Sequence, residues 1–544
     1  MKRKKSRTPK SKKKRIDLDM EQLEQLVQRV EAGTLQEGDA ALIKAMIENL
    51  VLLSQSVDEK AVTIKKMLRR LFGASTEKKD NVITSKDDES KGKGAGEDED
   101  AQKSKGGYQK KKKKAKGHGR NGQKDYQRAD RIGVKHPELT ANSPCPECKE
   151  GKLYALTEPG VEIRIKGVAP LQATVYELEK LRCNLCQKIF TAPMPAEAGS
   201  KKYDASAAVM IGLLKYGSGM PFNRLAGFQG NLGIPLPSST QWDVINGHTK
   251  YFDPIFDQFI RSAAQGGVLH NDDTDSKILS LIKENKLENP KRKGIFTTGL
   301  VSLFQENKIV LFLTGREHAG ENMAKVLDHR EDGKDPPIQM CDAASRNISP
   351  AHLTILALCL VHARRNFVDA ALSFPEVCSF VIEALAKVYH FDALAKKQRM
   401  DGYQRLCYHQ EHSGPVMETL HTWLHKQLAD KIVEPNSDTG RAVKYMINHW
   451  EGLTAFMRVP NAPLDNNICE RALKKAILNR KNSLFFRTEN GAHTGDVYMS
   501  LIYTCELAGV NSFEYLTALI VNHEQVKIAP TSWMPWNYTS SLPT

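Results

Sequence analysis

Long hydrophobic runs are missing from this chain. Its longest mostly apolar run, residues 353–361, is too short to cross a bilayer. The N-terminus is charged and leads into an acidic, amphipathic stretch, so it lacks the apolar segment of a secretory signal. Cysteine is scarce as well: the ten cysteines comprise two CxxC pairs and six scattered residues, which does not fit a secreted disulfide framework. We therefore expect a cytoplasmic protein that has no membrane contact.

Acidic residues are absent from the first fifteen positions, of which ten are basic. The formal net charge of the chain is +15, so this arm holds most of the surplus. A dense basic arm binds phosphate, which indicates nucleic acid as the partner; a solubilising tail or a contact with anionic lipid is the alternative. A lysine run at residues 110–114 is either a second phosphate contact or a solvated spacer.

Hydrophobic residues make up 40% of the 544 residues, which permits a large core in roughly three or four domains. Apolar residues at three- and four-residue spacings predict helices over residues 16–72, for which self-association as a hairpin or coiled coil is the default. Residues 74–128 are of low complexity and predict a linker, and the Pro-, Trp- and Ser-rich residues 530–544 predict a loose tail.

Two CxxC knuckles predict a zinc ribbon. A strand-rich stretch separates them, and each knuckle supplies two thiolates from one tight turn, so that four soft ligands can surround Zn²⁺. Unmetallated thiols or a redox pair are the alternative. The four predicted ligands are Cys145, Cys148, Cys183 and Cys186.

Helical and strand-like patterns alternate in the second half of the chain. Residues 203–264 read as helices, the last of them over 238–259 with Ser238 and Ser239 as caps, and form either a helix-turn-helix-like DNA module or a structural bundle. Strands are then predicted at 268–272, 295–303, 309–313, 338–341 and 353–361, with a helix over 317–328. Three strands, a helix and a further strand open a ribonuclease-H-like fold, in which Asp272 and Asp342 end the first and fourth strands.

Residues 463–486, PLDNNICERALKKAILNRKNSLFF, start a helix that carries Glu470. One interpretation is a capping box, with Asn467 as the cap and Glu470 three residues later. The other is a metal ligand that acts with the two aspartates. Three carboxylates at one sheet edge can hold two Mg²⁺ (or Mn²⁺) ions, which activate a water or a 3′-hydroxyl for in-line phosphoryl displacement.

Several stretches resemble the insertion-sequence-66 class of transposases, within the DDE superfamily. LLKYGSGMPFNRLAGF and GNLGIPLPSSTQW resemble its region before the first aspartate, and HNDDT resembles the first-aspartate motif. LCLVHARRNF, GRAVKYMINHWEGLTAFM and the PLDNNICERALKKAILNRKNSLFF segment resemble its later motifs. LRRLFGASTEK and the double CxxC resemble its N-terminal half. The resemblance implies a bacterial transposase that cuts and joins DNA at the ends of a mobile element.

The resemblance also implies the catalytic triad Asp272, Asp342 and Glu470. The family's usual Asp-Glu-Thr is here Asp272-Asp273-Thr274. Strand alternation places Asp272 with Val268 and His270 and Asp273 on the opposite face, so Asp272 is preferred and Asp273 is the fallback. QMCDAASRN departs from the family's Asp-Gly run, although Asp342 has no near rival; a strand-end turn residue is its other interpretation.

Five further residues are predicted near the substrate. His362 is expected beside the metal site, and one of the two neighbouring arginines on DNA, because the guanidinium fork suits phosphate. Packing of His362 and surface ion pairs are the alternative. The five are His362, Arg364, Arg365, Arg480 and Lys481.

The expected fold class is multidomain α+β: a ribonuclease-H-like α/β catalytic core with an all-helical insertion, preceded by a zinc ribbon and an N-terminal helical or coiled-coil segment. The expected order is a basic disordered arm (1–15), a helical or coiled-coil region (16–73), a disordered charged linker (74–128), a zinc-ribbon DNA-binding domain (129–198), a helical region (199–264), the first part of the core (265–366), a helical insertion (367–458), the second part of the core (459–525) and a C-terminal tail (526–544).

The expected function is metal-dependent cleavage and strand transfer of DNA. The expected partners are DNA, further copies of the chain through the N-terminal helices, and small accessory proteins of the same element, with action on DNA in the bacterial cytoplasm. Two other classes fit the same residues: a non-catalytic, zinc-dependent DNA-binding regulator, and a ribonuclease-H-fold nuclease that hydrolyses without joining.

Overall fold

A computed structural model of the chain describes residues 20–34, positions 36, 38–40 and 43, residues 138–153 without 145, residues 169–182, and residues 189–542 without 289, 372 and 373. The chain divides into two compact units, Glu89–Thr174 and the combination of Met1–Asp88 with Val175–Thr544. The basic arm, the linker and most of the predicted N-terminal helices lie outside the described residues. Helix α1, Met20–Glu31, is described and is helical, as its periodicity predicts. Within the described part, no helix is both long and apolar enough to span a membrane.

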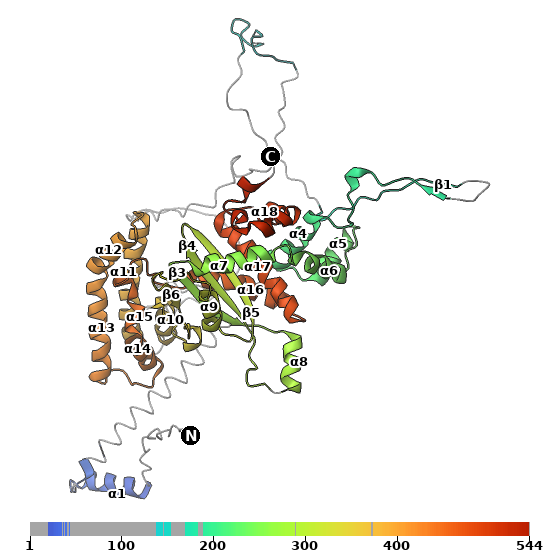
Figure 1. Cartoon of the computed structure of the whole chain (residues 1–544). Coiled ribbons are helices and arrows are strands. Elements are labelled where there is room, and N and C mark those ends of the chain that lie inside the picture. Colours follow the sequence, from blue (N-terminus) through green and yellow to red (C-terminus); the bar gives the residue numbers. More distant parts are fainter. Residues whose placement is uncertain are drawn as a thin grey trace, which may run out of the picture. The chain divides into compact units, whose positions relative to one another are not determined.

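The centre of the larger unit is a five-stranded mixed sheet (Figure 1). Its order is β5-β4-β3-β6-β7; β3, β4 and β5 form an antiparallel meander, and β6 and β7 run parallel to β3. The strands are β3 (Val268–Asp275), β4 (Phe296–Phe304), β5 (Asn307–Gly315), β6 (Ile338–Cys341) and β7 (Ile355–Leu358). The five predicted strands are confirmed; the first and third are longer and the last is shorter than expected. Because β3 continues to Asp275, the prediction that Asp272 ends the first strand is wrong. Helix α8, Leu279–Leu287, was not predicted and lies between β3 and β4.

Each face of the sheet meets different helices. Gly299 of β4 faces α16 (Asn467–Ser483), because a Cβ there would lie 2.9 Å from side-chain carbons of Leu473. Thr298, one residue earlier, faces α9 (Ala319–Leu327), since its hydroxyl accepts a 2.8 Å hydrogen bond from Asn322. Side chains alternate along a strand, so every second residue of β4 and of its partner β3 points toward α16.

Helix α17, Glu489–Ala508, lies along the free edge of β5. Backbone N–H groups of alternate β5 residues donate to α17 side-chain oxygens four residues apart: Val310 to Thr504 at 3.0 Å, Phe312 to Ser500 at 2.9 Å, and Thr314 to Asp496 at 2.6 Å. Four helical residues rise about 6.0 Å and two strand residues about 6.6 Å, so the two rows stay in step. The helix thereby satisfies an edge that would otherwise invite pairing with another strand.

Helices surround the sheet. Those of residues 360–457 pack on one another on the β7 side of the sheet, where α15 and η5 contact β7 (Figure 1): α10 (Leu360–Ala370), α11 (Pro375–Lys397), α12 (Gly402–His412), α13 (Gly414–Ala429), α14 (Asp438–Asn448), α15 (Trp450–Leu453) and η5 (Ala455–Met457). Those before β3 are α4 (Ala205–Gly212), the π-helical η3 (Leu213–Gly217), α5 (Phe222–Asn231), α6 (Ser238–Thr249) and α7 (Asp253–Ala264).

The predicted helix over residues 238–259 is wrong in two respects. It is two helices, α6 and α7, and α7 restarts with Pro254 in its first turn, where a missing N–H is tolerated. Ser238 and Ser239 do not cap α6; Pro237 occupies the cap position, and no side chain caps this described helix.

The prediction of a loose tail is also wrong. After α18 (Ser512–Val521) and α19 (His523–Ile528), the chain forms η6 (Pro530–Trp533) and η7 (Tyr538–Ser541). Trp533 is only 3% exposed, and its carbonyl accepts a 2.8 Å hydrogen bond from the Tyr515 hydroxyl. Trp533, one of the two tryptophans of this segment, therefore anchors it to the core.

Trp533→Ala is expected to lower the free energy of unfolding by roughly 3–5 kcal/mol, because it leaves a large cavity. Ile528→Ala is the matched control: this side chain is 83% exposed, and its truncation should cost less than about 0.5 kcal/mol. Urea unfolding followed by circular dichroism measures both. Equal stability of the two variants would show that the segment does not pack in solution.

Candidate active site

Asp272 and Asp342 lie on neighbouring strands, on the sheet face that α16 covers. Asp272 pairs with Gly299 across β3 and β4, and Gly299 faces α16. Strand β6 runs parallel to β3 with Met340 opposite His270, and Asp342 follows at the end of β6. Because both aspartates are two residues beyond that pair, alternation directs them to the same side.

Asp273 points to the other face. Its carboxylate forms a hydrogen bond with His318 Nδ1 at 2.9 Å and an ion pair with Arg346, at 3.4 Å from a guanidinium nitrogen. His318 is the residue that precedes α9, on the face opposite α16. The alternation predicted from sequence is therefore confirmed, and the two adjacent aspartates have separate environments.

Asn347 connects the two aspartates. Its side-chain nitrogen donates to Asp342 Oδ1 at 2.7 Å and to Asp272 Oδ1 at 3.2 Å, so one amide holds both carboxylates. Its backbone carbonyl accepts hydrogen bonds from Asn271 at 2.6 Å and Gln339 at 2.7 Å. Asn347 is fully buried at the end of the short helix η4 (Ser345–Asn347). Sequence reasoning missed it; a polar residue five positions after Asp342 was the available signal.

Asn466 fixes the start of α16 against β3. Its side-chain nitrogen donates to the carbonyl of Asn271 at 3.0 Å, so its side-chain oxygen faces His270 Nδ1, also at 3.0 Å. Burial lowers the pKa of His270 to about 4, so the ring is neutral and Nδ1–H can donate. The backbone N–H of Asn466 donates to Cys359 Sγ at 3.2 Å, which ties the same loop to the start of α10.

The capping-box interpretation of Glu470 is wrong. Helix α16 begins at Asn467 with Asn466 in the cap position, and no side chain caps this described helix. Glu470 Oε1 is buried and has no hydrogen-bond partner among the described residues. The carboxylate is thus left available for another role.

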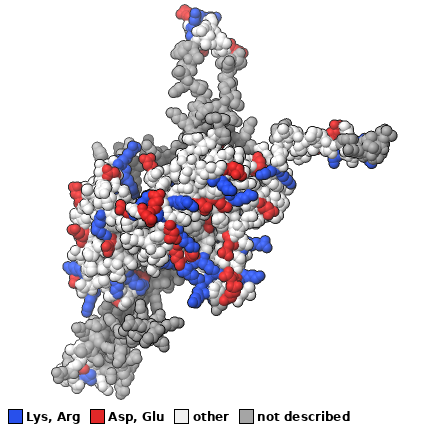
Figure 2. Space-filling view, in the orientation of Figure 1, with Lys and Arg blue, Asp and Glu red and all other residues white. Residues whose placement is uncertain are grey.

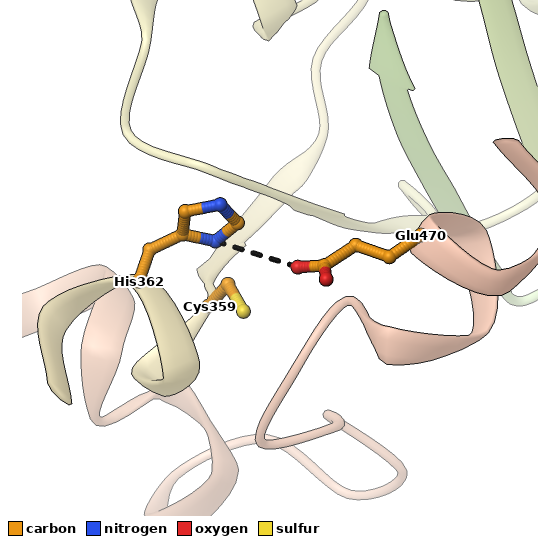
Figure 3. Close-up of side chains that lie close together, drawn as sticks. All are labelled: Cys359, His362 and Glu470. Atoms are coloured by element: carbon orange, nitrogen blue, oxygen red, sulfur yellow. Dashed lines mark ion pairs between the residues drawn. The ribbon is translucent and has the colours of Figure 1, made fainter. Parts of the chain in front are cut away.

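Glu470 points toward the start of α10, where His362 and Cys359 lie (Figure 3). His362 Nδ1 is 3.8 Å from Glu470 Oε1, and one ligand atom from each of Cys359, His362 and Glu470 lies within 4.8 Å of the others. Among the described residues, these three side chains form a group whose ligand atoms lie close enough together to bind one metal ion. Cys359 was missed from sequence, although it stands three residues before His362.

Negative charge accumulates at this site. Burial raises the pKa of Asp272 to about 7; the Asp273 backbone N–H opposes the rise, and the charges of Asp342, Asp273 and Glu470 add to it. In the described part of the chain, the ligand atoms that lie within 4.8 Å of one another are those of Cys359, His362 and Glu470, and neither Asp272 nor Asp342 belongs to that group.

The predicted basic residues have different surroundings. Arg364 and Arg365 are half-buried on α10, and Lys481 is exposed near the end of α16. Arg480 donates to the Thr274 hydroxyl at 3.1 Å and to the Asp275 carbonyl, so it holds the end of β3. On the face shown in Figure 2, basic and acidic side chains are interspersed.

Most of the predicted zinc ligands lie outside the described residues: Cys145, Cys183 and Cys186. Cys148 is described and exposed, and its sulfur accepts the Gly151 N–H at 3.4 Å. A hairpin of β1 (Lys180–Arg182) and β2 (Ile189–Thr191) flanks the second CxxC pair. The zinc ribbon stays a prediction.

Comparison with known proteins gives the class. The model of the Transposase IS66 family matches residues 202–494, which include the whole sheet and α16. The chain belongs to this family, and its role as a transposase follows, with DNA as the implied partner.

Among similar proteins, the uncharacterized protein y4hP of Sinorhizobium fredii is 25% identical over 395 residues, 66% of this chain and 67% of that protein. The uncharacterized protein y4jD of the same organism is 34% identical over 197 residues, 35% of this chain and 37% of that protein.

Proposed function

We propose that the chain is a DDE transposase whose triad is Asp272, Asp342 and Glu470. The observation that carries the proposal is the shared amide of Asn347, which holds the two aspartates together on the face that α16 covers with Glu470. A meander of three strands followed by two parallel strands supports a ribonuclease-H-like core. Family membership supports the same conclusion.

Asp272, Asp342 and Glu470 would hold two Mg²⁺ or Mn²⁺ ions, because hard oxygen ligands suit these cations. Bound there, the ions supply positive charge that activates the attacking oxygen and stabilises the leaving one. The protein's part is to hold the ligands in place: Asn347 orients the aspartates, and Asn466 fixes the helix that carries Glu470.

Other segments would deliver DNA to the site. The basic arm, the zinc ribbon and Arg364, Arg365 and Lys481 are the proposed phosphate contacts, because neutralising phosphate charge gives most of the affinity for DNA. Self-association through the N-terminal helices would bring two element ends together, and small accessory proteins of the element are further proposed partners. We place this activity on DNA in the bacterial cytoplasm.

Strand transfer tests the function. The full chain is incubated with Mg²⁺ and DNA that carries the ends of its own element, and products are separated on a denaturing gel. Joined products are expected. Cleaved but unjoined DNA would indicate a nuclease, and binding without any cleavage by the full chain would indicate the non-catalytic regulator.

A further inference from the structure

We propose that Cys359, His362 and Glu470 form a site for one Zn²⁺ ion, in which Glu470 is shared with the proposed triad. The ligand atoms are Cys359 Sγ, one ring nitrogen of His362 and a carboxylate oxygen of Glu470, all within 4.8 Å of one another. Figure 3 shows the three side chains converging from the start of α10 and from α16. The proposal does not depend on DNA joining, because these donors would bind the ion whether or not the chain is a transposase.

Two polar atoms at this site have no hydrogen-bond partner among the described residues. His362 Nδ1 and Glu470 Oε1 are both buried, and neither has a hydrogen-bond partner within the described part of the molecule. They face each other at 3.8 Å, which is too long for a hydrogen bond. Two ligands at about 2.0–2.1 Å from a tetrahedral ion lie roughly 3.4 Å apart, so a small movement closes them on Zn²⁺. Buried polar atoms seldom stay unpaired, and an ion explains both.

The third donor is fixed before any metal arrives. The Asn466 N–H donates to Cys359 Sγ at 3.2 Å, and the Leu360 N–H donates to the Leu464 carbonyl at 3.0 Å. These two bonds join the start of α10 to the loop that leads into α16. Outer contacts of this kind orient metal ligands, and binding of Zn²⁺ releases the thiol proton to solvent.

The mixed donor set selects the ion. A thiolate and an imidazole favour Zn²⁺, whereas Mg²⁺ prefers oxygen ligands alone. Three protein ligands leave a fourth position open to water or substrate. The site therefore differs from the carboxylate pair at Asp272 and Asp342, with which it shares only Glu470.

Zinc stoichiometry of the full chain tests the site. Wild type, Cys359→Ser, His362→Gln and Glu470→Gln are dialysed against Zn²⁺ and then analysed by elemental mass spectrometry, with thermal unfolding to verify that each is folded. Wild type should hold one more Zn²⁺ per chain than each variant. The predicted ribbon contributes equally to all and cancels in the difference.

Cys407→Ser is the matched control, since Cys407 is exposed on α12 and should keep the wild-type zinc content. Equal zinc in all folded proteins, or displacement of the extra ion by Mg²⁺, would overturn the proposal. Parallel strand-transfer assays separate the two conclusions. A zinc difference together with DNA joining that survives loss of Asp272 would reject only the proposed function, and joining without a zinc difference would reject only this site.

Discussion

Asp272→Asn is expected to reduce DNA strand transfer by about 10³-fold or more while leaving the fold intact and more stable at neutral pH. The loss follows because an amide cannot replace a charged metal ligand. The higher stability follows because burial, with the nearby charges of Asp342, Asp273 and Glu470, raises the pKa of Asp272 from 3.8 to about 7. Between these values the unfolded chain releases the proton and the folded chain keeps it, so metal-free stability falls as pH rises through this window.

The substitution should remove that pH dependence and raise the metal-free free energy of unfolding at pH 7 by roughly 1–3 kcal/mol. Urea unfolding between pH 4 and pH 8 in a chelator measures it, and strand transfer is measured separately with Mg²⁺. A variant that joins DNA at the wild-type rate would remove Asp272 from the site.

Asp273→Asn is the matched control, one residue away on the opposite face. It removes the ion pair with Arg346 and weakens the hydrogen bond with His318, so it should cost about 1 kcal/mol of stability. Strand transfer should stay within about tenfold of wild type, because Asp273 faces away from Glu470. The reverse result, with joining lost only in Asp273→Asn, would make Asp273 the ligand.

Local patterns predict the strands and the direction of their side chains. β4 and β5 have strong apolar character, and the two-residue period of a strand is enough to place Asp272 and Asp273 on opposite faces. Helix α8 was missed because its sequence, LSLIKENKL, is short and gives little apolar periodicity. The tail was misread because composition does not reveal that Trp533 finds a buried position.

Contacts between distant residues were not predictable in this way. Asn347 touches Asp272 from 75 positions away, and Asn466 touches Cys359 from 107 positions away. A helix-start rule placed Asn467 in a cap, whereas the neighbouring Asn466 takes that position and uses its side chain for β3. The conformation of such residues depends on side-chain contacts with residues far away in the sequence, and local helix propensity carries no information about those contacts.

Asn466→Ala is expected to destabilise the chain by roughly 2–4 kcal/mol and to lower strand transfer by about 10²-fold or more. Asn466 is fully buried, and its truncation leaves the Asn271 carbonyl and the His270 ring nitrogen without partners, each at a cost of about 1–3 kcal/mol. It also releases the first turn of α16, and misplacing a reacting group by about 1 Å can cost 10²-fold in rate. Urea unfolding and strand transfer on the same preparation measure both effects.

Asn467→Ala separates this role from a general effect of the Asn-Asn pair. Asn467 is only half-buried, and its backbone N–H, which the substitution keeps, donates to Asp465 at 3.1 Å. The free energy of unfolding of Asn467→Ala should differ from wild type by less than about 0.5 kcal/mol, and its strand transfer should be near wild type. If both asparagine variants lose activity equally, the anchor is not the Asn466 side chain. If Asn466→Ala loses stability but joins DNA normally when folded, Glu470 does not depend on this anchor for its position.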